Sequence, residues 1–318
     1  MRHRRAHTTL LAALVSALTT GLLGGCSATD AHEEPAAPSA KNSRPAPSDF
    51  ALRHVELPVS DYRLSATEYA EVSRAKNILV TECMERLGFS WSAPTPTVPR
   101  QDRRYGVIDL PAAQRYGYHL LPEDNTAPER ADHEPSKDET DALTGGQLLD
   151  GDTGRSRLLP GYTAPVRKVG GKSVPPGGCS QEAERKLLGR TDLTSEAGVV
   201  SRINTDSFTE SQQKPAVKKT LAEWSACMRK AGFDYPDPLR SIATARLDSP
   251  TVPAAEIELA TADVRCKESV DLVDVWSRAE ATVQQRMIKQ HAAATAKERA
   301  DKATRLRNAA EVIRASGE

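Results

Sequence analysis

The sequence predicts a mostly α-helical protein made of two disulfide-tethered helical units. The main observation is a repeated segment, Cys-Met-x-x-x-Gly-Phe, which occurs at residues 83–89 and again at residues 227–233. Apolar residues recur at helical spacing before each copy, whereas runs with the alternation of a strand are few. We also expect a long irregular insert in the first unit and a long C-terminal helix in the second.

Each copy of the repeat has the features of a helix that ends at a glycine. In a Schellman-type ending, the residue after the glycine packs against the third residue from the helix end. Phe89 would then pack on Met84, and Phe233 would pack on Met228. The cysteine that precedes each methionine therefore lies on a well-terminated turn, which suits an anchor for a cross-link.

Three helices stand out in the pattern. A capping box, Ser-x-x-Glu at 65–68, opens a helix over residues 66–87, and Pro215 opens a second one that ends at Gly232. After Pro253 no glycine or proline occurs until Gly317, which predicts one long helix. Its residues after about 286 are mostly charged or alanine, so we expect this distal part to project or to pack weakly.

The region between the first two helices has no clear period. Residues 104–109 predict a short strand or turn, and residues 112–119 predict a single helical turn. The acidic and polar run from 122 to 154 is expected to be a disordered or mobile loop. Cys179 precedes a charged segment and is expected at the start of a further helix.

The composition restricts the classes of partner. Lys and Arg total 43 and Asp and Glu total 43, which disfavours nucleic acid because nucleic-acid binding needs a basic surface. Aromatic residues make up only 4% of the chain, and 21 prolines are present. Part of the chain is therefore expected to lie outside any packed core.

The N-terminus has the pattern of an export signal. Arg2, Arg4 and Arg5 precede an apolar stretch at 10–23 that is too short for a bilayer-spanning helix. It ends in Leu-Leu-Gly-Gly-Cys, which resembles the lipobox of bacterial lipoproteins. The resemblance implies that residues 1–25 are a lipoprotein signal peptide and that the Cys26 sulfur carries a diacylglycerol. Acyl chains would then hold the protein on the extracytoplasmic face of the cell membrane.

The rest of the chain is divided by composition and by the repeat. Residues 26–49, rich in Ala, Pro and Ser, predict a flexible tether. Residues 50–190 are expected to form the first helical unit with its long loop insert. Residues 191–318 are expected to form the second unit with the long C-terminal helix.

Four cysteines remain after Cys26, and outside the cytoplasm they should form two disulfides. Three pairings are possible, and the repeat favours Cys83 with Cys179 and Cys227 with Cys266. A zinc site is disfavoured because no Cys-x-x-Cys spacing occurs. No metal and no cofactor are expected.

Together these features resemble a group of actinobacterial exported lipoproteins to which no activity is assigned. The resemblance rests on the lipobox, the two Cys-Met-x-x-x-Gly-Phe segments and the charged, alanine-rich C-terminal segment. It also rests on Arg-Tyr-Gly at 104–106 and Tyr-Gly-Tyr at 116–118. It covers most of the chain after the signal, and it brings no assigned activity to carry over.

Aromatic side chains concentrate in one part of a chain that has few of them. The candidate ligand surface consists of Trp91, Tyr105, Tyr116, Tyr118 and His119. Such residues could stack on sugar rings or hold a peptide. The alternative, that they form a satellite core under the long loop, is favoured.

Three functions remain open at this point. The first is a non-enzymatic, membrane-anchored surface lipoprotein, an interaction or structural module with an envelope protein or cell-wall glycan as partner. The second is a cell-wall or peptide hydrolase with an unrecognised site near His119, Asp109 and Glu123. The third, a solute-binding lipoprotein, is disfavoured because such proteins alternate strands with helices. Zincin and nucleophile-elbow motifs do not occur in the sequence.

Overall fold

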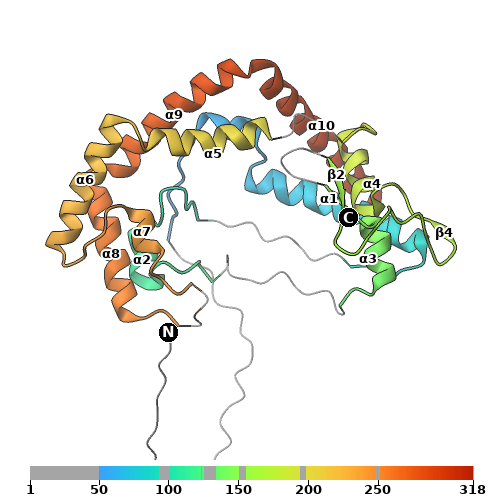
Figure 1. The fold of residues 1–318 in the computed structure, drawn as a ribbon, viewed down its shortest axis with the longest axis horizontal. Coiled ribbons are helices and arrows are strands. Elements are labelled where there is room, and N and C mark those ends of the chain that lie inside the picture. Colours follow the sequence, from blue (N-terminus) through green and yellow to red (C-terminus); the bar gives the residue numbers. More distant parts are fainter. Residues whose placement is uncertain are drawn as a thin grey trace, which may run out of the picture. The chain divides into compact units, whose positions relative to one another are not determined.

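The computed structural model describes residues 50–92, 101–122, 124, 134–149, 155–193, 198–247, 249 and 251–317 (Figure 1). All of these residues belong to one compact unit. Within them lie ten α-helices, one short 3₁₀-helix and two antiparallel two-stranded sheets. The expectation of a mostly α-helical fold is therefore confirmed. The expected signal peptide, Cys26 and the expected tether lie outside the described residues.

The elements follow one another along the chain in a simple order. They are η1 (Pro58–Tyr62), α1 (Ala66–Leu87), α2 (Leu110–Tyr116), α3 (Lys137–Thr144), β1 (Gln147–Leu149), β2 (Ser156–Leu158), β3 (Lys168–Val169), β4 (Lys172–Ser173), α4 (Gly178–Leu188), α5 (Val199–Ser211), α6 (Pro215–Lys230), α7 (Pro238–Ile242), α8 (Ala254–Ser269), α9 (Leu272–Gln290) and α10 (Ala292–Ser316). Strand β1 pairs with β2, and β3 pairs with β4.

The two copies of the repeat end their helices in the same way, as predicted. Gly88 and Gly232 both have left-handed backbones, with φ of 97° and 93°. The Phe89 N–H donates to the Met84 carbonyl at 3.0 Å, and the Phe233 N–H donates to the Met228 carbonyl at 2.9 Å. These are the hydrogen bonds of a Schellman ending. Both methionines are fully buried.

The predicted long C-terminal helix is wrong in its continuity, because the structure has three helices there. The chain leaves α8 at Val270 and enters α9 through Asp271, whose φ is 51°. Aspartate tolerates this left-handed conformation better than most residues, so the break needs neither glycine nor proline. A second interruption separates α9 from α10 at His291.

The expectation that the distal part projects is also wrong. Helix α10 packs against α1 and α4. Ala309 is buried, and Leu306, Val312 and Ile313 pack against the same hydrophobic cluster. Their spacing of three to four residues makes a narrow apolar stripe, which is enough to seat an otherwise charged helix.

The acidic run at 122–154, expected to be a loop, contains the helix α3. Ser136 and Glu139 form a capping box at the start of α3, and Gly145 ends the helix with a φ of 60°. Ala142 is fully buried in this short helix. The run is polar in composition, but one small apolar face is enough to hold α3 against α4.

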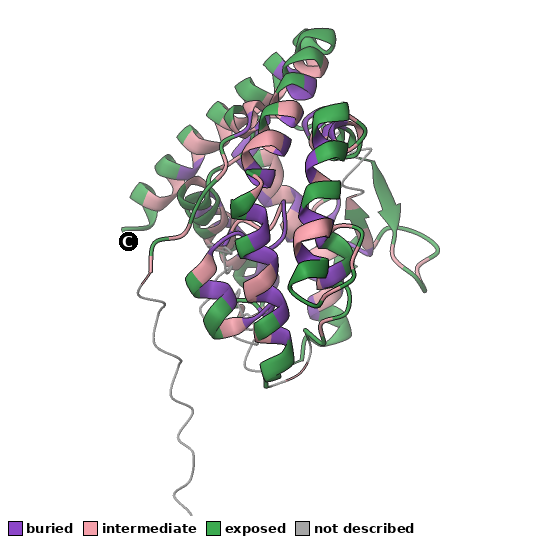
Figure 2. Ribbon diagram, turned by 90° about the vertical axis from the view of Figure 1, so that its left-hand side faces the viewer, coloured by how far each residue is buried: buried purple, intermediate pink, exposed green. Residues whose placement is uncertain are grey.

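Two hydrophobic clusters lie under the two repeats. The first is formed by α1, α3, α4 and α10, which we call the Cys83 unit. The second is formed by α2, α6, α7, α8, the start of α9 and the loop at 105–108, which we call the Cys227 unit. A third, smaller cluster joins η1 and α5 to the end of α9 and the start of α10. Figure 2 shows buried positions on the faces that the helices turn toward one another.

Packing does not follow the expected division of the chain at residue 190. Residues 105–118 precede Cys179 in sequence but pack in the Cys227 unit, and α10 comes last but packs in the Cys83 unit. The chain therefore passes between the two units several times.

Candidate functional site

The two disulfides have the predicted partners. Cys83 is bonded to Cys179 with the Cα atoms 5.6 Å apart, and Cys227 is bonded to Cys266 with the Cα atoms 5.7 Å apart. Cys83 and Cys179 are fully buried, while Cys227 is half-buried. In each unit the bond joins the end of the repeat helix to the helix that packs beside it.

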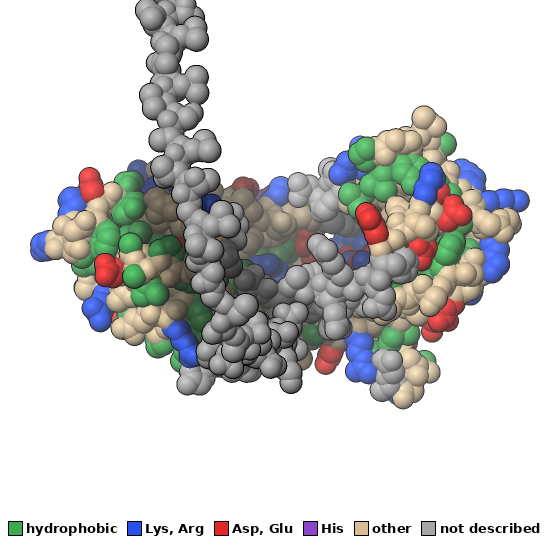
Figure 3. Space-filling model, turned by 90° about the horizontal axis from the view of Figure 1, so that it is seen from below, with side chains coloured by type: hydrophobic (Ala, Val, Ile, Leu, Met, Phe, Trp, Pro, Cys, Tyr) green, Lys and Arg blue, Asp and Glu red, His purple; other side chains and the backbone are tan. Residues whose placement is uncertain are grey.

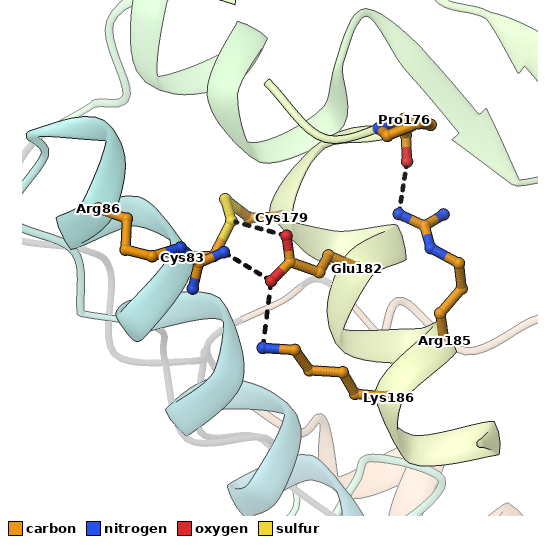
Figure 4. Close-up of a disulfide and its surroundings, with 7 residues drawn as sticks. All are labelled: Cys83, Arg86, Pro176, Cys179, Glu182, Arg185 and Lys186. Carbon is orange, nitrogen blue, oxygen red and sulfur yellow. Dashed lines mark hydrogen bonds and ion pairs between the residues drawn. A yellow bond between two sulfur atoms is a disulfide. The ribbon is translucent and has the colours of Figure 1, made fainter. Parts of the chain in front are cut away.

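A charged group covers the first disulfide (Figure 4). Glu182 on α4 places Oε2 3.9 Å from the Cys83 sulfur, and its other oxygen accepts hydrogen bonds from Arg86 at 2.6 Å and Lys186 at 3.1 Å. Burial opposes the ionisation of Glu182, but the two cations outweigh it and hold its pKa below the ordinary 4.5. The group is an ion-pair cluster that ties α1 to α4.

The five residues of the candidate ligand surface do not come together on one face. Tyr105 and Tyr118 are 1% and 0% exposed and belong to the core of the Cys227 unit. Trp91 packs against the cluster of the Cys83 unit. Tyr116 is half-buried, and the Arg115 guanidinium lies 5.5 Å from its ring centre, within the limit of about 6 Å for a cation–π contact. The aromatic surface is therefore not assembled, and its two central tyrosines serve the main core.

Tyr118 reaches a buried ion pair on α8. The Lys267 ammonium donates to the Asp263 carboxylate at 2.8 Å and to the Val107 carbonyl at 2.8 Å. Asp263 also accepts from the Trp224 indole at 3.0 Å and from the Tyr118 hydroxyl at 3.3 Å. Burial raises the pKa of Asp263 and lowers the pKa of Lys267, while their mutual attraction opposes both shifts.

Tyr105 reaches a second buried carboxylate, that of Glu280 on α9. The Tyr105 hydroxyl donates to it at 2.7 Å, the Ser207 hydroxyl donates at 3.1 Å, and the Arg104 guanidinium forms an ion pair with it. Burial and the neighbouring carboxylate both raise the pKa of Tyr105. Arg104 and Tyr105 thereby attach the loop to both α5 and α9.

His119 has a different carboxylate partner from the one expected. Its Nε2 lies 3.6 Å from Glu256 Oε2 and has no hydrogen bond within the described residues. The other Glu256 oxygen accepts the Tyr118 N–H at 2.9 Å. Asp109 instead accepts the backbone N–H of Arg53 at 2.7 Å, and burial raises its pKa. Glu123, the third member of the predicted hydrolase site, lies outside the described residues.

Glycines explain the two tyrosine motifs of the sequence. A Cβ on Gly106 would lie 2.9 Å from Lys267 Nζ, and a Cβ on Gly117 would lie 2.7 Å from Glu256 Oε1. Both glycines also have positive φ. Arg-Tyr-Gly and Tyr-Gly-Tyr are therefore sites where the loop backbone approaches buried charges closely.

The buried charges were not among the residues expected to form a site. Asp263 and Lys267 lie four residues apart on α8 and are both buried. The available signal was their position, because they lie on the same helical face as Leu259 and Val270. Glu280 carries the same signal, because Trp276 and Val283 lie on its helical face.

An open polar depression of about 920 Å³ lies where the chain enters α1. It is lined by η1, the first turn of α1 and two cations of α10, Arg299 and Lys302. Arg299 is 3.6 Å from Asp61, and Lys302 is 2.9 Å from Glu68. These ion pairs join α10 to η1 and to the start of α1.

No protein-family model, curated protein or solved structure matches this chain. Among the described residues, no three His, Cys, Asp or Glu side chains form a metal-binding group. In the same part of the chain, no helix is both long enough and apolar enough to cross a membrane.

Proposed function

We propose that the protein is a non-enzymatic surface lipoprotein that serves as an envelope interaction or structural module. The observation that carries this proposal is the use of the buried charges. Asp263, Glu280 and Glu256 all bind residues of the 104–118 segment. They are at most 8% exposed, so their hydrogen-bonding capacity serves the chain itself. This arrangement suits a rigid scaffold that presents its outer surfaces.

Anchoring through Cys26 is the second part of the proposal. It is supported by the lipobox-like sequence and by the Ala- and Pro-rich stretch at 27–49. Two or more acyl chains give stable attachment, because each buried CH₂ contributes about 0.8 kcal/mol. The Cys26→Ser variant should remain unlabelled by a radioactive fatty acid and leave the membrane fraction or stay unprocessed. Unchanged labelling and fractionation would overturn the anchoring.

The interaction role can be tested in the native envelope. The acylated protein should retain a defined envelope protein or wall fragment after mild cross-linking, and the Cys26→Ser variant should retain less of it. The fully folded variant Lys218→Ala, changed at an exposed position of α6, is the matched control. Recovery of the same material with an unrelated acylated protein would contradict a specific module.

The hydrolase alternative is favoured by one observation, the buried His119 Nε2 that lies 3.6 Å from Glu256 and makes no hydrogen bond within the described residues. A histidine–carboxylate pair can serve as a general base when it can reach a substrate. Purified protein would then release fragments from isolated cell walls or peptides, and His119→Gln would abolish the release while the protein stays folded. Our proposal expects no release from either protein.

A further inference from the structure

The stretch from Arg155 to Gln181 contains five cations and no acidic residue. In the structure this stretch forms β2, which is the second strand of the β1–β2 hairpin. It also forms the whole β3–β4 hairpin and the start of α4. Both hairpins are attached to one turn, because Leu159 N–H donates to the Gly146 carbonyl at 3.0 Å and Val166 N–H donates to the Gly145 carbonyl at 2.9 Å. Positive charge is therefore concentrated on one small substructure of a neutral protein.

Three of these cations are exposed and have no ion-pair partner in the described part of the chain. They are Arg157 on β2, and Arg167 and Lys168 at the start of the second hairpin. The nearby acids are occupied by other cations: Asp141 pairs with Lys137 at 2.6 Å, and Glu182 pairs with Arg86 and Lys186. Lys and Arg side chains gather at the right-hand edge of Figure 3, the edge where Figure 1 shows β4.

Exposed leucines accompany the cations. Leu148 is 43% exposed and lies directly across from Arg157 in the β1–β2 ladder, so both side chains are on the same face. Leu158 is 36% exposed, but as the next residue of β2 it lies on the opposite face of the ladder. The tip of the second hairpin, Gly170 and Gly171, is open, since an added Cβ there would meet nothing within 4 Å. We call Leu148, Arg157, Arg167 and Lys168 the hairpin surface.

We propose that the hairpin surface docks on the anionic phospholipids of the membrane in which the protein is anchored. Cations attract anionic headgroups, and an adjacent leucine gains by entering the boundary with the acyl chains. A dissolved polyanion would attract the cations, but it would offer the exposed leucine no apolar environment to enter. The combination therefore favours a lipid surface over a soluble acidic partner.

The length of the segment between the expected anchor and the described residues supports a membrane as the partner. This step rests on the proposed function. Residues 27–49 separate the expected lipid anchor from the first described residue. A flexible chain of this length has a root-mean-square end-to-end distance of roughly 25–30 Å. The anchored protein would therefore stay within a short distance of the headgroups, so that a weak contact becomes populated through high effective concentration.

Vesicle binding of the non-acylated protein tests the proposal directly. The chain from residue 26 onward, carrying Cys26→Ser, keeps every described residue and cannot insert an acyl chain. We expect it to sediment with phosphatidylcholine vesicles that contain phosphatidylglycerol and not with vesicles of phosphatidylcholine alone. Raising the salt concentration should weaken the binding, because exposed charges are screened.

Charge reversal identifies the surface. The double variant Arg167→Glu, Lys168→Glu should lower the partition coefficient by about tenfold or more, since each cation near an anionic leaflet contributes about a fivefold factor. The control is Lys218→Glu, Lys219→Glu, which makes the same change of charge on exposed positions of α6. It should change binding by less than about twofold. Equal losses in both variants, or no preference for phosphatidylglycerol, would overturn the proposal.

Leu148 distinguishes a membrane from an anionic wall polymer. Leu148→Ser should weaken vesicle binding and leave binding to soluble polyphosphate unchanged. If Leu148→Ser has no effect on vesicles and polyphosphate competes fully, the surface recognises polymer charge and the lipid proposal fails. Failure of the acyl anchor would appear in the fatty-acid labelling of Cys26→Ser and would leave the vesicle result intact.

Discussion

The Cys83 unit and the Cys227 unit begin from the same device and differ in what fills them. Both end a helix with the same Schellman turn, bury the methionine and tie the preceding cysteine to a neighbouring helix. The buried residues of the Cys83 unit are small and aliphatic. The Cys227 unit buries Trp224, Trp276, Tyr105 and Tyr118 together with ionised groups. The repeated turn thus determines where the disulfide is attached. The residues buried in each unit determine which substitutions destabilise it.

The two cysteines that are bonded to the repeats lie at different positions in their helices. Cys179 is the second residue of α4, whereas Cys266 lies near the end of α8. The equivalence between the units therefore covers the repeat helix and its turn, and it does not extend to the helix across the disulfide.

The largest effect is expected from removing α10, which packs in the Cys83 unit and in the small third cluster but not in the Cys227 unit. Deleting residues 291–318 exposes the apolar groups that α10 covers and should cost roughly 4 to 6 kcal/mol of stability. Chemical denaturation would measure it, and hydrogen exchange should show the loss in α1 and α4 but not in α6. Ala309→Asp should destabilise strongly, while Ala310→Asp at the exposed neighbouring position should be nearly neutral. A truncated protein of unchanged stability would contradict this packing.

Breaking the disulfides compares the units next. The bonds join residues 96 and 39 positions apart. The loop-entropy model gives a loss of about 4.7 kcal/mol for Cys83→Ala, Cys179→Ala and about 3.9 kcal/mol for Cys227→Ala, Cys266→Ala. Because the Cys227 unit keeps its aromatic core, we expect it to be more stable without its disulfide than the Cys83 unit is without its own. In a Trp91→Phe background, circular dichroism of Trp224 and Trp276 during denaturation would report on the Cys227 unit, because Trp91 packs in the Cys83 unit. The reverse order of stability would contradict the comparison.

The third prediction concerns the buried ion pair Asp263–Lys267, which has no counterpart among the described residues of the Cys83 unit. Lys267→Met should destabilise the protein by about 3 kcal/mol or more, because it leaves the Asp263 carboxylate buried without its cation. Lys186→Met removes a half-exposed cation from the Cys83 unit and serves as the matched control. It should cost less than about 1 kcal/mol. Urea denaturation of the two variants would measure both values, and similar losses would show that burial of the pair has little importance.

Alanine at the two turn glycines tests whether the repeat is energetically equal in both units. Gly88→Ala and Gly232→Ala each place a side chain at a positive φ, which costs about 1 to 2 kcal/mol. Gly88→Ala should cost slightly more, because its Cβ would lie 3.3 Å from Lys172 Nζ while that of Gly232 meets nothing. Thermal denaturation of both variants would show it. A loss at only one of the sites would mean that the turns are equivalent in geometry alone.

The smallest effect is a pH dependence at the first disulfide. The folded-state pKa of Glu182 is lowered, so its contribution is complete above the ordinary value of 4.5 and is lost as the pH falls through the lower folded value. Stability measured by denaturation between pH 6 and pH 3 should therefore decline less in Glu182→Gln than in the unchanged protein, by a fraction of a kcal/mol. Identical pH profiles would remove Glu182 from the acid response.

The sequence predicted the local features best. The capping box at Ser65 and the glycine at 88 placed α1 at its observed bounds, and the repeated turn led to the correct disulfide pairing. These are short-range signals, in which the residues that form the structure are neighbours in the chain.

The sequence predicted long-range packing poorly. The breaks at Asp271 and His291 carry no glycine or proline, and the stripe on α10 is only a few residues wide. The aromatic segment looked like one surface because its residues are close in sequence. Their placement depends on Asp263, Glu280 and Glu256, which come more than a hundred residues later.

The order of the disulfides has a consequence for how such a chain could mature. Each disulfide joins two cysteines that follow one another in the sequence: Cys83 is bonded to Cys179, and Cys227 is bonded to Cys266. A chain that crosses a membrane with its N-terminus first would present the cysteines in this order. An oxidase that joins each new cysteine to the one waiting before it would then produce the native pairing without isomerisation. Tyr105 and Tyr118 would be enclosed in the first covalent loop before α8 and α9 arrive to bury them.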